Sequence, residues 1–128
     1  MGERSGMTVM IRTLVLVTGL AFSVPALAGE ASVEKVDVRR DGNSWHFSVT
    51  VRHADTGWDH YADRWEILAP DGTVLATRVL LHPHVNEQPF TRSLGNVTIP
   101  EDVNEVIVRA HDKVHAFGGK TFRLKIRE

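Results

Sequence analysis

The sequence contains no cysteine, and its only methionines, Met1, Met7 and Met10, lie near the amino end. Without cysteine there are no disulfides, so a domain formed by this chain must be held together by packing. The absence of thiolates, and of thioethers beyond residue 10, argues against a Cu(I) site built from soft ligands. A metal bound by this chain would therefore be held by imidazole and carboxylate groups.

Neither sign of charge is in excess, because 15 lysine and arginine residues are matched by 16 aspartate and glutamate residues. A nucleic-acid surface needs a basic stripe, so we expect no nucleic-acid partner. Long apolar runs and basic amphipathic helices are also missing after residue 28. We therefore expect no membrane contact by the rest of the chain.

The amino-terminal segment has the pattern of a secretory signal. Arginines precede an apolar stretch at residues 13–24, and Ala26-Leu27-Ala28 has the A-x-A form of a cleavage site. The stretch is too short to span a bilayer, which takes about 20 residues. We expect a cleavable signal peptide at residues 1–28 and a periplasmic or secreted product.

Cleavage there would leave residues 29–128 as a single domain that begins at Gly29. Met7 or Met10 is an alternative initiator, because Glu3 is unusual in a signal peptide. No cysteine follows the cleavage site, which argues against a lipid anchor.

Alternation of apolar and polar residues with a period of two dominates residues 29–128. In residues 45–51 the tryptophan, phenylalanine and two valines share one face, which indicates a half-buried strand. Comparable patterns predict strands near residues 33–38, 64–69, 74–81, 90–99, 105–110 and 121–127. Seven short strands predict an all-β fold, a seven-stranded antiparallel sandwich of the immunoglobulin-like, fibronectin type III-like kind.

Two resemblances point the same way. The stretch E-V-I-V-R-A-H-D-K-V-H-A-F-G-G-K-T-F-R-L-K-I resembles the last two strands of a fibronectin type III module. The stretches G-W-D-H-Y-A-D-R-W and H-P-H-V-N-E-Q-P-F-T-R-S-L resemble a group of small exported bacterial proteins with such a sandwich. The resemblance implies export and a β-sandwich, and it implies no mechanism.

Six of the seven histidines lie in three short segments that we expect to be loops. If successive strands alternate in direction, these loops meet at one end of the sandwich, where such folds often place binding sites. Histidine is the commonest metal ligand. We expect Cu(II) or Zn(II) to be bound by four of them, with two further ligands possible. The four are His82, His84, His111 and His115, and the two are His53 and His60.

Carboxylates in the same loops are expected to orient the imidazole rings through hydrogen bonds. They are Asp55, Asp59, Asp63, Glu87 and Asp112. The first three recur every four residues, but the calcium-loop pattern is absent, so helix capping, salt bridges or solvation is favoured for them. The alternative for the histidines is a polar network that fastens the loops without metal.

A second hypothesis is a protein-interaction or accessory domain that docks an envelope protein. Its anchors would be Trp58, Tyr61, Phe90 and Phe117, with Arg92 at the rim, because aromatic residues and arginine are enriched at interface hot spots. Trp58 and Tyr61 could instead fold back and cap the sandwich. Nucleophile and phosphate-loop motifs are absent, and small sandwiches more often bind than catalyse, so we expect no enzyme.

Overall fold

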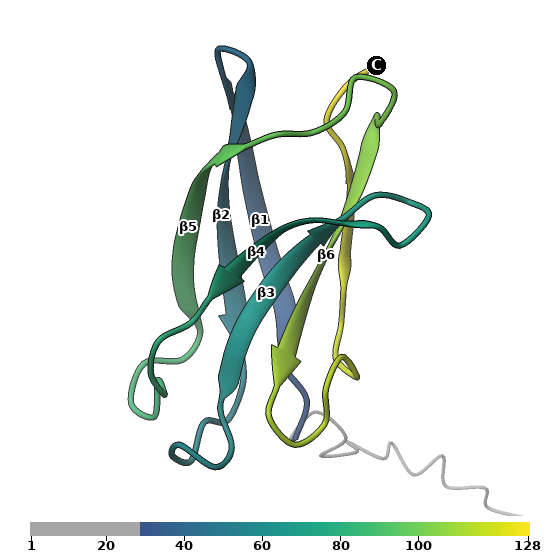
Figure 1. Ribbon diagram of the computed structural model, residues 1–128. Coiled ribbons are helices and arrows are strands. Elements are labelled where there is room, and N and C mark those ends of the chain that lie inside the picture. The colour runs from purple at the N-terminus through teal and green to yellow at the C-terminus, as the bar shows by residue number, and fades with distance from the viewer. Residues whose placement is uncertain (1–28) are drawn as a thin grey trace, which may run out of the picture.

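The structure is a computed structural model that describes residues 29–128, so the expected signal peptide at residues 1–28 lies outside the described residues. This range contains seven strands (Figure 1): β1 Ser32–Asp41, β2 Ser44–Arg52, β3 Ala62–Leu68, β4 Val74–Val79, β5 Phe90–Val97, β6 Glu105–Asp112 and β7 Phe122–Lys125. Within it, no helix is long and apolar enough to cross a membrane.

The strands form two antiparallel sheets that face each other. One sheet has the order β1-β2-β5 and the other the order β4-β3-β6-β7. Figure 1 shows the two layers, with β3 and β6 in front of β1 and β2. The predicted all-β, seven-stranded immunoglobulin-like sandwich is confirmed.

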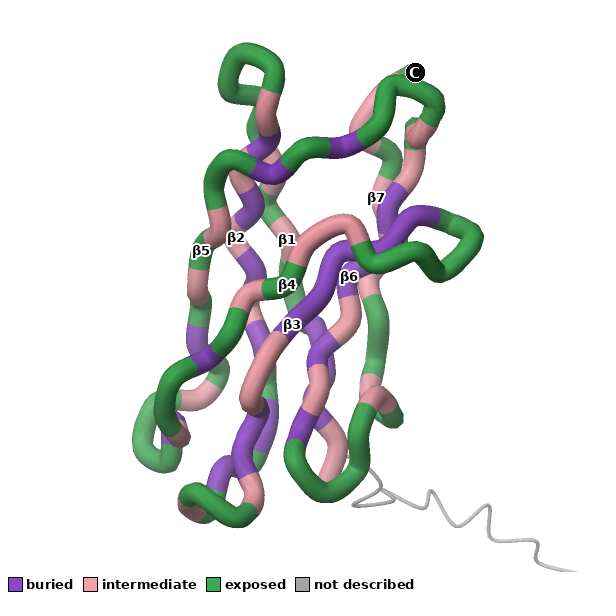
Figure 2. The backbone as a smooth tube through the Cα atoms, viewed as in Figure 1, coloured by how far each residue is buried: buried purple, intermediate pink, exposed green. Residues whose placement is uncertain are grey.

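The core lies between the sheets and follows the alternation in the sequence. Phe47, Val49 and Val51 of β2 are fully buried, and they face Trp65 and Ile67 of β3 within one apolar cluster. In Figure 2 buried positions alternate with partly exposed ones along β2 and β6. Each large apolar side chain buried in this way contributes about 1.5–3 kcal/mol, so packing can replace the missing disulfides.

Three strands, β4, β5 and β7, end two residues earlier than the sequence pattern predicts, and the first two lead into loops. β4 stops at Val79, although the Leu80 amide still donates to the carbonyl of Asp63, the residue opposite it, at 2.9 Å, and the Leu80 side chain is buried. β5 stops at Val97 after a bulge at Asn96, whose φ is 54°. The chain is therefore free to leave the sheet before each following loop.

Strand alternation brings three loops to one end of the sandwich. The β2–β3, β4–β5 and β6–β7 loops lie together at the lower end in Figure 1, beside the start of β1. The β1–β2 turn and the β5–β6 connection lie at the opposite end. The loops with the six histidines therefore share one end, which is the condition for a common site.

Candidate metal centre

A buried histidine–carboxylate pair follows directly after β2. His53 continues the inward face of the strand, and the side chains of His53 and Asp55 are both fully buried. The Asp55 carboxylate accepts hydrogen bonds from the amides of Ala62, at 3.0 Å, and His84, at 2.6 Å. It also accepts one from Nδ1 of His53. A single carboxylate thus joins the β2–β3 loop to the β4–β5 loop.

The contact with Asp55 fixes the orientation of the His53 ring. Because Nδ1 donates to the carboxylate, Nε2 is left to face the centre of the loop end. There it lies 3.2 Å from His60 Nε2 and 3.3 Å from the carbonyl oxygen of Gly29. A carboxylate that holds the far nitrogen of a histidine in this way is typical of metal-binding histidines.

His60 reaches the same point from a tight turn, in which its amide donates to the Gly57 carbonyl at 3.2 Å. Its Nε2 lies 3.2 Å from the carbonyl oxygen of Gly29 and 3.4 Å from Oδ1 of Asp112. This nitrogen therefore has a carbonyl, a carboxylate and another imidazole as neighbours.

Asp112 comes from the end of β6, in the opposite sheet, and its side chain is fully buried. Its Oδ1 accepts hydrogen bonds from the amides of Val114, at 2.8 Å, and His115, at 2.7 Å. Its Oδ2 is buried, has no hydrogen-bond partner and lies 3.9 Å from His53 Nε2. Such an oxygen is costly to bury unless a proton or a cation accompanies it.

These groups have the spacing of a metal site. One ligand atom each from His53, His60 and Asp112 can be chosen so that all lie within 4.8 Å of one another, and no other such group of three occurs in residues 29–128. Two ligands at about 2.1 Å from one ion in tetrahedral geometry lie about 3.4 Å apart. The nitrogen–nitrogen distance of 3.2 Å and the nitrogen–oxygen distance of 3.4 Å are close to this value.

The charges at this end favour a cation. Burial alone lowers the pKa of His53, but its hydrogen bond to Asp55 and the charges of Asp55 and Asp112 outweigh burial and raise that pKa. Burial alone raises the pKa of both carboxyls. Hydrogen bonds from His53 and from backbone amides outweigh it and lower the pKa of Asp55, and amides of the β6–β7 loop do the same for Asp112. Two buried carboxylates therefore stay ionised beside two imidazoles.

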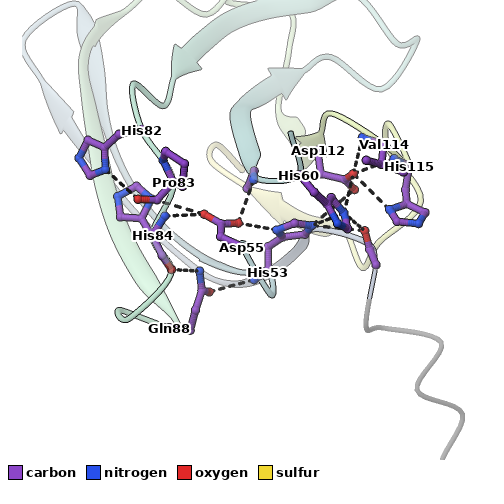
Figure 3. Close-up of polar contacts among 12 residues, drawn as sticks. His53, Asp55, His60, His82, Pro83, His84, Gln88, Asp112, Val114 and His115 are labelled. Atoms are coloured by element: carbon purple, nitrogen blue, oxygen red, sulfur yellow. Dashed lines mark hydrogen bonds and ion pairs between the residues drawn. The ribbon is translucent and has the colours of Figure 1, made fainter. Parts of the chain in front are cut away.

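His82 and His84 lie elsewhere. Figure 3 shows them on the side of Asp55 away from His53, His60 and Asp112. The His84 ring stacks on Phe90 at 3.9 Å, and its Nε2 lies 2.8 Å from an Arg92 guanidinium nitrogen. Burial and the Arg92 charge lower the pKa of His84. The Arg92 guanidinium therefore blocks the approach of a metal ion to Nε2 of His84.

His111 is also apart, because it is on the outer face of β6 and its Nδ1 lies 2.5 Å from Asp63. His115 is at the edge of the centre, with its ring 5.0 Å from that of His60 and its Nδ1 3.2 Å from Asp112. The four histidines expected as the main ligands thus do not form one site. The two expected as further ligands form the centre with Asp112, which was expected to orient rings.

The remaining predicted residues lie around this centre. Asp59 and Glu87 are exposed, and Glu87 lies 3.4 Å from Arg92. Asp55, Asp59 and Asp63 do not share a helical face, because the β2–β3 loop contains no helix. The backbone carbonyl of Gly29, which the sequence pattern did not single out, is part of the centre.

The proposed interface anchors are mostly covered. Phe90 is buried in the core, at 1% exposure, so it is not the exposed anchor that we expected. Tyr61 is buried beneath Trp58, which is 62% exposed. The Arg109 guanidinium lies 3.6 Å from the centre of the Phe117 ring. Trp58 is therefore the one large exposed aromatic group among the four.

The fold and this centre define a class, an immunoglobulin-like β-sandwich with a His/Asp group that could hold a metal ion. No family model matches the chain. A protein of Halomicrobium mukohataei named "Putative lipoprotein" is 42% identical over 92 residues, which cover 71% of this chain and 45% of that protein. The chain thus spans less than half the length of this relative.

Two solved structures are similar. A superoxide reductase from Nanoarchaeum equitans has a TM-score of 0.51 at 11% identity, over 77% of this chain and 93% of that one. A superoxide reductase (1Fe-SOR) from Giardia intestinalis has a TM-score of 0.47 at 13% identity, over 74% of this chain and 99% of that one. At such identity the first comparison shows a shared fold.

The comparison corrects one expectation. From the sequence we expected no enzyme, because small sandwiches more often bind than catalyse. Superoxide reductases are enzymes with the same sandwich fold, so that argument fails. Fold does not determine function, and any chemistry has to be argued from the site.

Proposed function

We propose that the chain is an exported domain of the cell envelope that binds a divalent transition metal through His53 Nε2, His60 Nε2 and the Asp112 carboxylate. The observation that carries the proposal is the buried Oδ2 of Asp112, which has no hydrogen-bond partner and lies 3.9 Å from His53 Nε2, while Oδ1 of the same carboxylate lies 3.4 Å from His60 Nε2. A cation bound there would satisfy this oxygen and both nitrogens at once.

The ligands favour particular metals. Imidazole suits zinc, copper, iron and nickel, and two histidines with one carboxylate also suit Fe(II). Among divalent ions a nitrogen and oxygen site binds Cu(II) most tightly. We therefore propose Cu(II) as the ion of highest affinity and Zn(II) as the next.

Titration of the untagged protein with Cu(II) and with Zn(II), in competition with a chromogenic chelator, tests the proposal. We expect one ion per chain with a Kd below about 10 µM, which corresponds to about 7 kcal/mol. His60→Ala should weaken binding by about tenfold or more. The control His111→Ala, on the outer face of β6 next to Asp112 but outside the centre, should bind as the unmodified protein does.

Weaker binding than this, or equal losses in both variants, would overturn the proposal. The centre would then be a polar network in which a protonated His53 is held between Asp55 and Asp112. The raised pKa of His53 favours that arrangement when no metal is bound.

A second candidate function is redox catalysis at the bound metal. The centre offers only three side-chain ligands, and catalytic metal sites keep a position open for substrate. Superoxide is the first substrate to assay, because the similar fold belongs to a superoxide reductase. We expect the metal-loaded protein to consume superoxide faster than the His60→Ala variant supplied with the same metal. Equal rates would remove this candidate.

A further inference from the structure

We infer that removal of the signal peptide creates one more ligand, the free α-amino nitrogen of Gly29. The inference rests on the proposed metal site and extends it. The metal site would then be complete only in the protein from which the signal peptide has been removed.

Gly29 already lies at the metal centre. Its carbonyl oxygen is 3.2 Å from His60 Nε2 and 3.3 Å from His53 Nε2. Covalent geometry keeps the nitrogen of a residue about 2.7–3.6 Å from its own carbonyl oxygen. An amine on Gly29 therefore lies within about 7 Å of both imidazole nitrogens, and rotation about the bonds of this residue can bring it closer.

The segment after Gly29 is firmly held. Ala31 and Val33 are buried, and the Val33 amide donates to the carbonyl of Lys120 at 2.8 Å. The Lys120 amide donates in turn to the hydroxyl of Ser32 at 3.1 Å. The β6–β7 loop thus fixes the start of β1, which limits where residue 29 can lie.

Close packing beside the start of β1 requires glycine at residue 119. A Cβ on Gly29 would lie 2.5 Å from Nε2 of the exposed His115 side chain, so that this ring would have to turn aside. A Cβ on Gly119 would lie 2.5 Å from the carbonyl carbon of Ala31. The backbone at Ala31 is therefore packed directly against the β6–β7 loop, and Gly29 lies beside the His115 ring.

The predicted cleavage point coincides with this residue, because Ala26-Leu27-Ala28 directly precedes Gly29. Hydrolysis of the Ala28–Gly29 bond consumes one water and leaves a carboxylate on Ala28 and an amine on Gly29. An amide nitrogen in the precursor is a poor ligand, since its lone pair is delocalised into the carbonyl. The new amine has no such restriction.

The amine can also lose its proton near neutral pH. An α-amino group has a pKa of about 7.7–8.0, compared with about 10.4 for lysine. On metal binding it releases one proton to solvent, and its lone pair binds the ion. With its own carbonyl oxygen it forms a small chelate ring, so Gly29 supplies two neighbouring ligand atoms.

The test uses protein exported by a bacterial host with its own signal segment. Mass spectrometry first identifies the amino terminus, which we expect to be Gly29. Cu(II) is then titrated into this protein, into the protein acetylated selectively on its α-amine, and into a variant with one serine inserted before Gly29. A variant with one serine added after Glu128 is the matched control.

We expect acetylation and the inserted serine each to weaken Cu(II) binding by about tenfold or more, and the carboxyl-terminal serine to have no effect. Selective ¹⁵N labelling of glycine, combined with electron–nuclear double resonance of the Cu(II) form, should show a directly bound ¹⁵N nucleus. His60→Ala is titrated beside these proteins. If it weakens binding but the blocked amine does not, the proposed metal site stands and this inference is overturned. If none binds Cu(II), both are overturned.

Discussion

Asp55→Asn should lower both the stability of the loop end and its affinity for metal. The two losses can be measured separately. The carboxylate accepts from His53, Ala62 and His84 while fully buried. An asparagine amide has only one acceptor oxygen, so its NH₂ group must face at least one buried donor. The loss of stability is smallest if this side-chain NH₂ group faces the backbone N–H of His84.

The magnitude follows from those contacts. One buried N–H without an acceptor costs about 1–3 kcal/mol, and the weakened bonds to the other two donors add about 1 kcal/mol. We expect the free energy of unfolding to fall by about 2–4 kcal/mol. For a domain of this size that lowers Tm by about 10–20 °C.

Metal-free protein should be measured by thermal unfolding, and metal affinity by Cu(II) titration. We expect affinity to fall by about 10–100-fold, because a neutral amide oxygen holds Nδ1 of His53, and so orients its ring, more weakly than the carboxylate does. Asp59→Asn, an exposed change in the same loop, is the control and should alter stability by less than about 0.5 kcal/mol. A Tm for Asp55→Asn within about 2 °C of the control would refute the assignment of Asp55 as a buried three-donor acceptor.

The same pair predicts a pH dependence in metal-free protein. The pKa of Asp55 is lowered, so its stabilisation is present above 3.8 and is lost as pH falls through the lowered value. The pKa of His53 is raised, so its stabilisation is present below 6.5 and is lost as pH rises through the raised value. Stability should therefore be greatest in mildly acidic solution. Asp55→Asn should flatten the profile and lower the His53 pKa, as followed by NMR of the imidazole protons.

Two further results are expected. Gly119→Ala should destabilise the protein by about 1–3 kcal/mol in denaturant unfolding, because its Cβ would overlap the Ala31 carbonyl. Gly95→Ala, whose Cβ has only an ordinary contact, should change stability far less, and equal effects would contradict the close approach. His84 should titrate below 6.5 by NMR, and Arg92→Gln should raise its pKa, since the guanidinium charge helps to lower it. An unchanged His84 titration in that variant would refute the contact.

The sandwich could be predicted because a half-buried strand has a period of two that the sequence displays directly. The same alternation also indicates which side chains at the end of β6 face the site. Asp112 follows Val106, Val108 and Ala110 on the inward face of β6, whereas His111 is on the outward face. Strand parity therefore indicated Asp112 as an inward group and His111 as an outward one.

The other contacts of the site could not be predicted in this way. Loops have no period, so nothing in the sequence places the His84 amide on Asp55 or Arg92 on the His84 ring. The carbonyl of Gly29 is a backbone atom, and its position depends on how β1 packs against the β6–β7 loop. The residue types predict neither these loop contacts nor the position of this carbonyl.

The centre draws its groups from both layers of the sandwich. His53 follows β2 in one sheet, and Asp112 ends β6 in the other. An ion held between them would act as a removable crosslink in a protein that has no covalent one. Its contribution would rise with the free metal concentration as RT ln(1 + [M]/Kd), about 2.7 kcal/mol at a hundredfold excess over Kd. The resistance of this protein to unfolding would then depend on the metal supply of its compartment.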